Sequence, residues 1–461
     1  MPTRGLVRPF LALFSLLFSL FAVQAFADSH VRIVRLSTVD GSVQIDRAVG
    51  SGFEKALPNL PITQGAKLRA HGEGRAEIEF EDGSTLRLVD GAAVEFPQLL
   101  LRDSGARATT VEVKGGTTYV NFGAKNNDEF AVVFAQQTAH MTLPVHFRLE
   151  IKDDDTAVLS VFKGELSVQG PEGTVNISRK QSASFDLAKP GEYKLSKNIE
   201  DLPFDEWDKR QDQYHNEYLA GTSTINSPYA YGMSDLAYYG NFFNAPGYGM
   251  VWQPFFTDAS WNPFMDGAWS WYPGAGYMWI SSYPWGWMPY RYGSWAFIPG
   301  FGWGWEPGYW NSWAAMPLVT NLPQGFVTPR PPVVVGGVHN TVIVNRGIGL
   351  VPTPNANNKL VVRSNSAGLG IPRGSLQNPA EISQRVLQTG SATVRLRPTS
   401  PPPMQPAVFP GMSSPGMSSP GMPSPGMSQG SPSFGSGPSS NSSEPIRSGA
   451  STGSRGAAPR R

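Results

Sequence analysis

Tryptophans spaced two residues apart are the side chains of this sequence best suited to holding a ligand. Twelve of the thirteen tryptophans lie between Trp252 and Trp313, and three pairs have one residue between the two rings. Side chains at i and i+2 of a β-strand lie on the same face, so each pair predicts two rings side by side. Indole rings left open in this way can stack on a glycan, a proline-rich peptide or another protein. The rings that we consider as an aromatic binding face are Trp269, Trp271, Trp285, Trp287, Trp295, Trp303 and Trp305.

The same rings could instead form the core of a small β unit. Burying one aromatic side chain removes about 150–250 Å² from water, which is worth several kcal/mol at about 25 cal/mol per Å². The glycines and prolines between the rings predict tight turns between short strands, with indoles lying against bare glycine backbone. Core, open binding face and contact with a membrane interface all fit the sequence.

Residues for acid–base, nucleophilic or metal chemistry do not group along the chain. Cysteine is absent, which excludes disulfides, thiolate nucleophiles and zinc–thiolate sites. His140 and His146 lie six residues apart on expected strands, outside the spacing of common metal motifs. Asp153, Asp154 and Asp155 lack the ligand spacing of a calcium loop. We therefore expect a protein that is not an enzyme and has no cofactor or metal, although a carboxylate pair that only the fold brings together has no signature in the sequence.

The first 27 residues have the pattern of a secretory signal peptide. Arg4 and Arg8 precede an uncharged, Leu/Phe-rich run that ends at Ala27 in an Ala-Phe-Ala pattern suited to signal peptidase. We expect cleavage between Ala27 and Asp28, export to the periplasm or cell exterior, and no membrane span in the mature chain. An uncleaved anchor is the alternative, because the nineteen uncharged residues are near the lower limit for crossing a bilayer.

Residues 28–200 have the alternating pattern of an all-β domain. Polar and apolar residues alternate at 75–80 and 84–89, which predicts half-buried strands. Asp82-Gly83 between them predicts a two-residue hairpin with a type I′ turn. The turn spacing suits an antiparallel sandwich, a roll or a solenoid, and the domain is long enough to bury its own core.

Three runs in this domain resemble the FecR domain. They lie at 60–68, 74–80 and 82–88, and Asp82-Gly83-Ser84 is their most specific part. Ala66-Lys67 stand where that family often has an acidic residue. In the regulators after which the family is named, the domain is the periplasmic half of a membrane-spanning antisigma system. The resemblance implies an exported β module for protein contact or ligand sensing.

Residues 201–220 predict one linking helix. Phe204, Trp207, Tyr214 and Tyr218 fall on one face of a 3.6-residue period, and Asp201 is placed to cap the first turn. We expect the aromatic face to dock on the β domain.

Residues 226–315 resemble a Trp/Gly/Pro-rich domain of unknown function that often follows a FecR module in bacterial exported proteins. The motifs include Gly-x-Trp-x-Trp from Gly267, Pro-Trp-Gly-Trp from Pro284 and Gly-Trp-Gly-Trp from Gly302. The resemblance implies no activity, because the family has no assigned function. Arg291 stands where a histidine is frequent, which weakens a histidine-dependent metal site. Arg291 is also the only basic residue among the rings, which disfavours nucleic acid as a partner.

The remaining residues have weaker patterns. We expect 316–397 to be poorly structured, with short strands at 331–335 and 341–344 and a brief helix at 379–387. From 398 to 461 proline, glycine, serine and methionine dominate, and Pro-Gly-Met recurs every five residues from Pro410. This composition predicts a disordered tail, since it buries too little apolar surface to offset chain entropy.

These patterns together predict an all-β envelope protein: a FecR-like sandwich, roll or solenoid, a linking helix, a Trp-rich repeat domain and a disordered tail. The expected role is binding or scaffolding, with an envelope protein, a glycan or peptidoglycan as partner. A periplasmic ligand-sensing component of a FecR-type system and a glycan-binding module are the alternatives. The oligomeric state is left open.

Overall fold

The computed structural model describes residues 32–123, 128–153, 155–189, 191–220, 225–308, 310, 313–333 and 358–397, and the backbone of 342–345. The expected signal segment, its cleavage site at Ala27 and Asp28, and the tail at 398–461 lie outside these residues. All helices and strands of the described residues belong to one compact unit of the chain, within residues 1–403. Within the described residues, no helix is long and apolar enough to cross a membrane.

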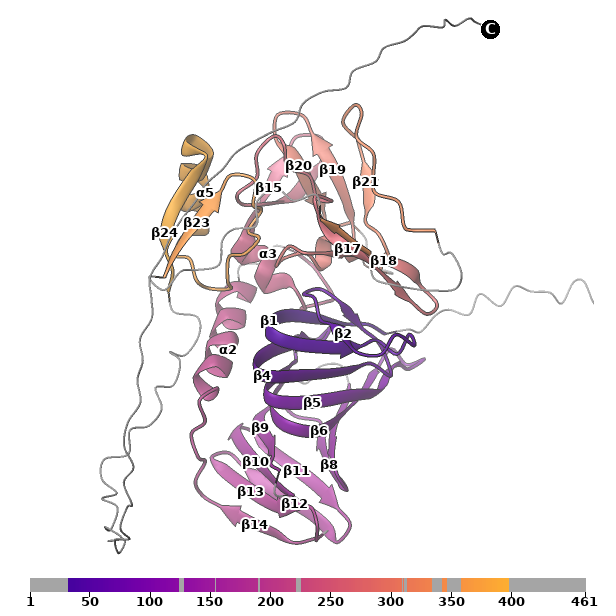
Figure 1. The fold of residues 1–461 in the computed structure, drawn as a ribbon, viewed down its shortest axis with the longest axis vertical. Coiled ribbons are helices and arrows are strands. Elements are labelled where there is room, and N and C mark those ends of the chain that lie inside the picture. The colour runs from indigo at the N-terminus through magenta and orange to yellow at the C-terminus, as the bar shows by residue number, and fades with distance from the viewer. Residues whose placement is uncertain are drawn as a thin grey trace, which may run out of the picture. The chain divides into compact units, whose positions relative to one another are not determined.

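The N-terminal region is one branched sheet of fourteen strands (Figure 1). Its strands are β1 (Val34–Asp46), β2 (Glu54–Lys55), β3 (Pro61–Ile62), β4 (Lys67–Glu79), β5 (Thr85–Leu101), β6 (Arg107–Phe122), β7 (Glu129–Phe134), β8 (Gln137–Met141), β9 (Val145–Ile151), β10 (Thr156–Lys163), β11 (Glu165–Gly170), β12 (Gly173–Ser178), β13 (Gln181–Asp186) and β14 (Tyr193–Ser196). Alternate side chains along these strands are buried, as in β7 and β4. The predicted all-β character is therefore confirmed.

Strand β6 is the branch point of the sheet. One edge of β6 pairs with β5, while the other pairs first with β7, in parallel over residues 108–112, and then with β9 over residues 116–122. Gly116 starts the second pairing with φ +68°, and a Cβ there would lie 2.2 Å from the Ala92 nitrogen, so only glycine fits. One path of strands continues from β6 through β7, β8 and β11 to β12, and the other through β9, β10 and β13 to β14.

The hairpin between β4 and β5 forms at the predicted place with a different turn. Phe80 N donates to Ser84 O at 2.9 Å and Gly83 N donates to Phe80 O at 3.0 Å, which closes a three-residue loop instead of a two-residue one. Gly83 has φ +90°, whereas Asp82 is not among the positive-φ residues that a type I′ turn needs. The Asp82 carboxylate explains the difference, because it accepts from the Ser84 N–H at 2.9 Å and from the Ser84 hydroxyl at 2.8 Å.

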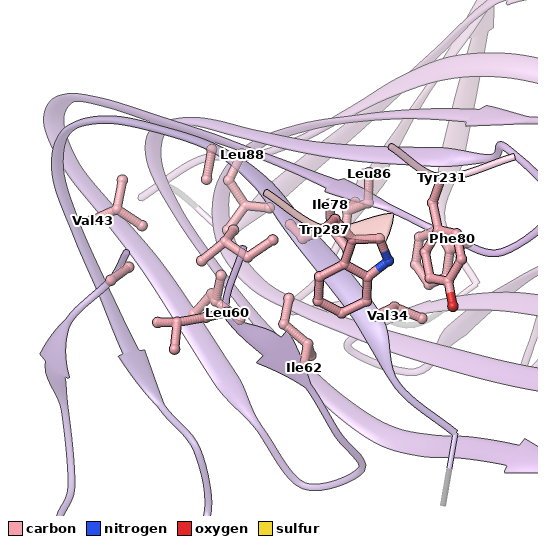
Figure 2. Close-up of a cluster of buried hydrophobic side chains, with 14 of the residues drawn as sticks. Val34, Val43, Leu60, Ile62, Ile78, Phe80, Leu86, Leu88, Tyr231 and Trp287 are labelled. Carbon is pink, nitrogen blue, oxygen red and sulfur yellow. The ribbon is translucent and has the colours of Figure 1, made fainter. Parts of the chain in front are cut away.

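The apolar core of the N-terminal sheet extends beyond the predicted FecR-like domain. Figure 2 shows Tyr231 and Trp287 beside Val34, Ile62 and Phe80 of the sheet. Trp287 is fully buried and Tyr231 is 2% exposed. The two rings come from the Trp-rich region, so the two predicted domains share one hydrophobic core.

The predicted linking helix is α2 (Asp205–Leu219), and its aromatic face is divided between two neighbours. Trp207 packs with Val89 and Tyr119 of the sheet. Tyr214 and Tyr218 instead contact Tyr238 of helix α3 (Met233–Tyr239), with ring centroids 5.6 and 5.0 Å apart. The expectation that the whole face docks on the β domain is therefore half correct, because α3 covers the second half of α2. The predicted cap at Asp201 is wrong, since α2 begins without a side-chain cap.

The Trp-rich region contributes strands to two small sheets, and α3 packs on β15 and β16 of one of them. Its elements are β15 (Gly240–Ala245), β16 (Gly249–Pro254), β17 (Asp266–Tyr272), β18 (Gly276–Ser281), α4 (Met288–Arg291), β19 (Ser294–Ile298), β20 (Gly302–Glu306) and β21 (Leu318–Thr320). Trp305 on β20 lies opposite Trp252 on β16 and Trp295 on β19, which makes an aromatic ladder across three strands. The pair Trp285 and Trp287 differs from the others, because it lies in the turn before α4 and not on a strand.

The segment after this region contains more structure than predicted. Strand β22 (Val342–Asn345) pairs with β17, and β23 (Lys359–Arg363) pairs with β24 (Ser391–Arg395) around helix α5 (Pro379–Thr389). The predicted strand and helix at 341–344 and 379–387 are thus confirmed within a few residues. No strand forms over 331–333, and 334–335 lie outside the described residues. The unpredicted part is the packing of this segment, where Leu360, Val386 and others join the main core.

Candidate binding cleft and ionic junction

The tryptophans considered as a binding face lie mostly in the core. Trp285, Trp287, Trp295 and Trp305 are fully buried, Trp269 and Trp303 are 2% and 4% exposed, and Trp271 alone is half-buried. This placement favours the interpretation of the rings as a core over an open face. Glycines allow it, as at Gly267, where a Cβ would lie 2.4 Å from the Trp279 ring.

Backbone carbonyls hold four of the buried indoles in place. The Nε1–H of Trp285 donates to Ala367 O at 2.7 Å, and that of Trp305 donates to Tyr292 O at 2.8 Å. Trp252 and Trp295 donate in the same way to Leu236 O and Pro289 O, each at 2.9 Å. Because a buried N–H costs free energy unless it is paired, these bonds fix the rings as structural elements.

An open cleft of about 690 Å³ lies at the edge of this aromatic core, and its volume is in the range of small-ligand sites. Four segments line it: the start of β15, the end of β16 with the loop that follows, β19 with the β19–β20 turn and the start of β20, and helix α5. Its lining includes Asn241, Gln253, Asp258, Trp261, Phe301, Trp303, Gln384 and Leu387. Of the rings proposed from sequence, Trp303 alone lines the cleft.

Phe301 is the exposed ring of the cleft. It is 48% exposed and lies at the tip of the β19–β20 turn, where its N–H donates to Ile298 O at 3.0 Å. Its ring stacks on Phe243 with centroids 5.5 Å apart and planes 26° apart. Gln253 braces the same turn, because its Nε2 donates to Phe301 O at 2.7 Å and to Trp303 O at 3.2 Å. The ring is thus held in position before any ligand arrives.

Helix α5 supplies one wall of the cleft. Ala380, Ser383, Gln384 and Leu387 line it, at the i, i+3, i+4 and i+7 positions of one helix face. The Ser383 hydroxyl accepts from the backbone N–H of Phe256 at 2.9 Å, which fixes the helix to the Trp-rich region. The sequence contains this helical spacing, but what the face contacts depends on distant parts of the chain.

The cleft carries little charge. Among the described residues, Asp258 is the only ionisable one that lines it. Its carboxylate accepts from the Ser260 and Ser364 hydroxyls at 2.5 and 2.9 Å. Burial by itself would raise the pKa of Asp258, but these hydrogen bonds lower it overall, so the group is ionised and already satisfied.

A cluster of buried charges, here called the ionic junction, connects the same C-terminal segment to the N-terminal sheet. Its members come from β1, β4, β5, β9, α2, α3 and the loop before α5: Arg35, Glu77, Glu79, Arg87, His146, Asp208, Asp212, His215, Asp235 and Arg373. All are buried or nearly so. No sequence pattern indicates the cluster, because its members are scattered along most of the described chain.

Arg373 joins three acidic groups of the ionic junction. Its Nη1 lies 2.6 Å from Glu77 Oε1, and its Nη2 lies 2.9 Å from Glu79 Oε1 and 2.7 Å from Asp235 Oδ2. Arg35 Nη1 lies 2.6 Å from the same Asp235 oxygen. Burial would raise the pKa of Asp235, but Arg373 and Arg35 lower it overall. The sheet, α3 and the C-terminal segment are thus held together by charge pairs.

Arg87 joins helix α2 to the sheet by charge pairs in the same way. Its Nε lies 2.8 Å from Glu77 Oε2 and its Nη1 lies 2.5 Å from Asp208 Oδ1. His215 Nε2 lies 3.0 Å from Glu77 Oε1. Burial would raise the pKa of Glu77, but His215, Arg87 and Arg373 hold it well below its usual range. Burial would lower the pKa of His215, and Glu77 raises it overall.

Two groups in the ionic junction have ligand atoms close enough to hold a metal ion. They are Glu77, Glu79 and His215, and His146, Asp208 and Asp212, each within 4.8 Å. The carboxylates of both groups already face arginines. A metal ion would have to displace guanidinium groups or lie beside them, so the donor sets do not favour one.

Two protein families match parts of the chain. Residues 66–167 match the family described as FecR protein, and residues 233–328 match a Family of unknown function (DUF6600). The chain therefore contains a FecR domain followed by a domain of unknown function that carries the tryptophan cluster, as the resemblances predict. No curated protein matches the chain.

Two crystal structures of a candidate anti-sigma factor from Parabacteroides distasonis ATCC 8503, at 1.65 and 2.50 Å resolution, are similar to part of the chain. Both are 16% identical, with TM-scores of 0.26 and 0.25, and the similar part covers 29% of this chain. It spans 59% of the length of that protein, less than two thirds. A similarity of this size carries no function from that protein to this one.

Proposed function

We propose that this protein is a non-enzymatic binding protein of the bacterial cell envelope that holds an envelope ligand in the cleft. The observation that carries the proposal is the composition of the cleft: it has aromatic walls and an amide rim, and Asp258 is the only ionisable residue among the described ones that line it. Acid–base and nucleophilic catalysis need a reactive group and a partner that activates it. A single carboxylate satisfied by two serines suits ligand binding better than a reaction.

Export is part of this proposal and rests on the sequence. Arg4, Arg8 and the apolar run that ends at Ala27 support a cleaved signal peptide. Mass spectrometry of protein purified from the periplasm or the medium should give Asp28 as the first residue. A cytoplasmic protein that retains residues 1–27 would contradict the envelope location.

In this proposal the FecR domain acts as the scaffold of the cleft. The shared core at Trp287 and the charge pairs of Arg373 support that role, since they fix the Trp-rich region and the C-terminal segment to the N-terminal sheet. A binding site is more selective when the elements that form it are held rigidly.

The test is cosedimentation of the purified full-length protein with an insoluble envelope fraction that contains peptidoglycan and outer membrane. We expect saturable retention that falls about tenfold in Phe301→Ala, because this variant removes the exposed ring of the cleft. Tyr193→Ala is the matched control, since Tyr193 is an aromatic residue of similar exposure, 50%, on β14 outside the cleft. Equal retention of all three proteins would refute the proposal.

A ligand-sensing role is a second candidate, and one observation favours it. Residues 358–397 contribute both the α5 wall of the cleft and Arg373 of the ionic junction. A ligand that moves α5 would therefore act on charge pairs that reach β4. Hydrogen exchange at β4 should change on ligand binding if the protein senses, and should stay constant if the protein only binds.

A further inference from the structure

We infer that the ligand of the cleft is a chain of uncharged sugar rings, recognised by stacking on Phe301 and by hydroxyl groups that donate to the cleft. This inference rests on the proposed function and adds the chemical class of the ligand. A pyranose ring presents an apolar C–H face and a rim of hydroxyls, so it needs a flat aromatic ring with polar acceptors around it. The cleft offers both.

The stacking surface is ready in the unliganded protein. Phe301 exposes about half of its side chain, and its other contacts, with Phe243 and with the turn that Gln253 braces, keep the ring in place. A ligand therefore loses little free energy in ordering this ring. Trp261 and Trp303 line the cleft but are 2% and 4% exposed, so they shape its wall while Phe301 presents an open face.

The hydrogen-bonding groups of the cleft favour a ligand that donates. Gln253 uses its amide nitrogen on Phe301 O and Trp303 O, which leaves its Oε1 to accept from a ligand. The Nε1–H of Trp261 donates to the Tyr283 hydroxyl at 3.0 Å and is likewise already used. Asn241 and Gln384 are exposed amides that can both donate and accept. Sugar hydroxyls match this set, because each is both a donor and an acceptor.

A proline-rich peptide fits the same groups less well. Prolines have no N–H, so such a peptide offers mainly carbonyl acceptors, and grooves that bind it need aromatic rings with free donors. The indole of Trp261 and the amide of Gln253 already donate inside the protein, so the donors left to such a peptide are the exposed amides of Asn241 and Gln384. A polysaccharide can use these donors and also donate to Gln253 Oε1, so it is the better match for this cleft.

Charge narrows the class of sugar. Within the part of the chain that the structure describes, no lysine, arginine or histidine lines the cleft, so phosphates and nucleic acids have no cation to pair with there. Asp258 is satisfied by Ser260 and Ser364, and its negative charge would repel acidic polysaccharides. Neutral glycan strands are left as the favoured ligands.

Calorimetric titration of the purified full-length protein with chitotetraose, cellotetraose and octaproline tests this inference. We expect at least one of the two saccharides to bind, and its affinity to fall about tenfold in Phe301→Ala and several-fold in Gln384→Ala. Tyr193→Ala should bind as the unsubstituted protein does. Gln384 is exposed on α5, so its variant keeps the test valid if Phe301→Ala does not fold.

Binding of octaproline without either saccharide would overturn the inference and make the cleft a peptide site. If no probe binds while the envelope fraction still retains the protein through Phe301, the sugar class is wrong and the proposed function stands. If neither the probes nor the envelope fraction bind, both proposals fail.

Discussion

The cleft and the ionic junction use the same C-terminal segment in opposite ways. In the cleft, α5 faces a partly exposed aromatic ring and a single satisfied carboxylate, and the surface remains open. In the ionic junction, Arg373 from the same segment is buried among three carboxylates that belong to β4 and α3. The comparison shows that charge in these two places is used to join elements, whereas the surface available to a ligand is nearly uncharged.

Arg373→Met should have the largest effect on stability, and it tests whether the junction holds the structure together. The variant leaves Glu77, Glu79 and Asp235 with fewer cations in a buried site, and breaking a buried pair in this way costs about 3–5 kcal/mol. Urea unfolding followed by tryptophan fluorescence measures the loss. Arg385→Met is the control, because Arg385 lies exposed on α5. If the two variants unfold at the same urea concentration, the junction is not a structural clamp.

Trp305→Phe should have a smaller effect and tests whether the ladder is core. The variant keeps a ring but removes the N–H that pairs with Tyr292 O, and a buried unpaired carbonyl costs about 1–3 kcal/mol. We expect the free energy of unfolding to fall by that amount, and to change little in Trp313→Phe, where the ring is half-buried. An unchanged stability of Trp305→Phe would mean that the ladder is not packed as described.

Phe301→Ala should change stability by about 1 kcal/mol or less, since the ring is half exposed and its main ring contact is the stack on Phe243. The variant should nevertheless lose about tenfold in retention by the envelope fraction, which is more than so small a loss of stability would cause. Thermal unfolding measures the stability of the same samples used for binding. A large drop in melting temperature would assign Phe301 to the fold and remove it from the binding surface.

The smallest effect expected is a pH dependence that comes from His215. The groups that face this ring are Glu77 and Glu79 on β4, Arg373, and the Ser234 hydroxyl on α3. Its pKa is raised in the folded protein, so its stabilisation is complete below the unfolded pKa of about 6.5 and is lost as pH rises through the folded pKa.

Urea unfolding between pH 6 and 9 measures this contribution. The free energy of unfolding should decline with rising pH in the unsubstituted protein, and the decline should be shallower in His215→Gln. Parallel curves for the two proteins would show that His215 does not contribute to the pH dependence.

The local elements were predictable because their signals lie within a few residues of one another. Alternation at 75–80 and 84–89 predicted β4 and β5, and the Trp-Gly-Trp spacing at Trp303 predicted two rings on one strand. Whether those rings are covered depends on neighbours such as β16 and α5, which no local pattern indicates. The turn type predicted at Asp82-Gly83 was wrong for a related reason, since the side-chain hydrogen bonds to Ser84 decide it.

The ionic junction could not be predicted at all from single residues. An arginine in a weakly patterned segment, such as Arg373, gives no sign that it will be buried against Glu77. Part of the cleft was predicted from the sequence, because Trp303 was proposed as a binding residue and a helix was expected at 379–387. Phe301 and Gln253 were not predicted to take part. Sites that are assembled from distant segments need the fold before their chemistry can be recognised.

The pairing of Arg373 with Glu77 spans 296 residues of chain, and this has a consequence for how the protein reaches its folded state. Contacts so far apart in sequence slow folding, since a long loop must close before the contact forms. Strand β4 is synthesised early, but Glu77 and Glu79 on this strand can pair with Arg373 only after the ribosome has added that residue. A chain that stops before residue 373 would leave Glu77 and Glu79 with Arg87, His215 and Arg35 but without the cation that joins both of them to α3. We would therefore expect proteases to remove truncated products while sparing the finished protein.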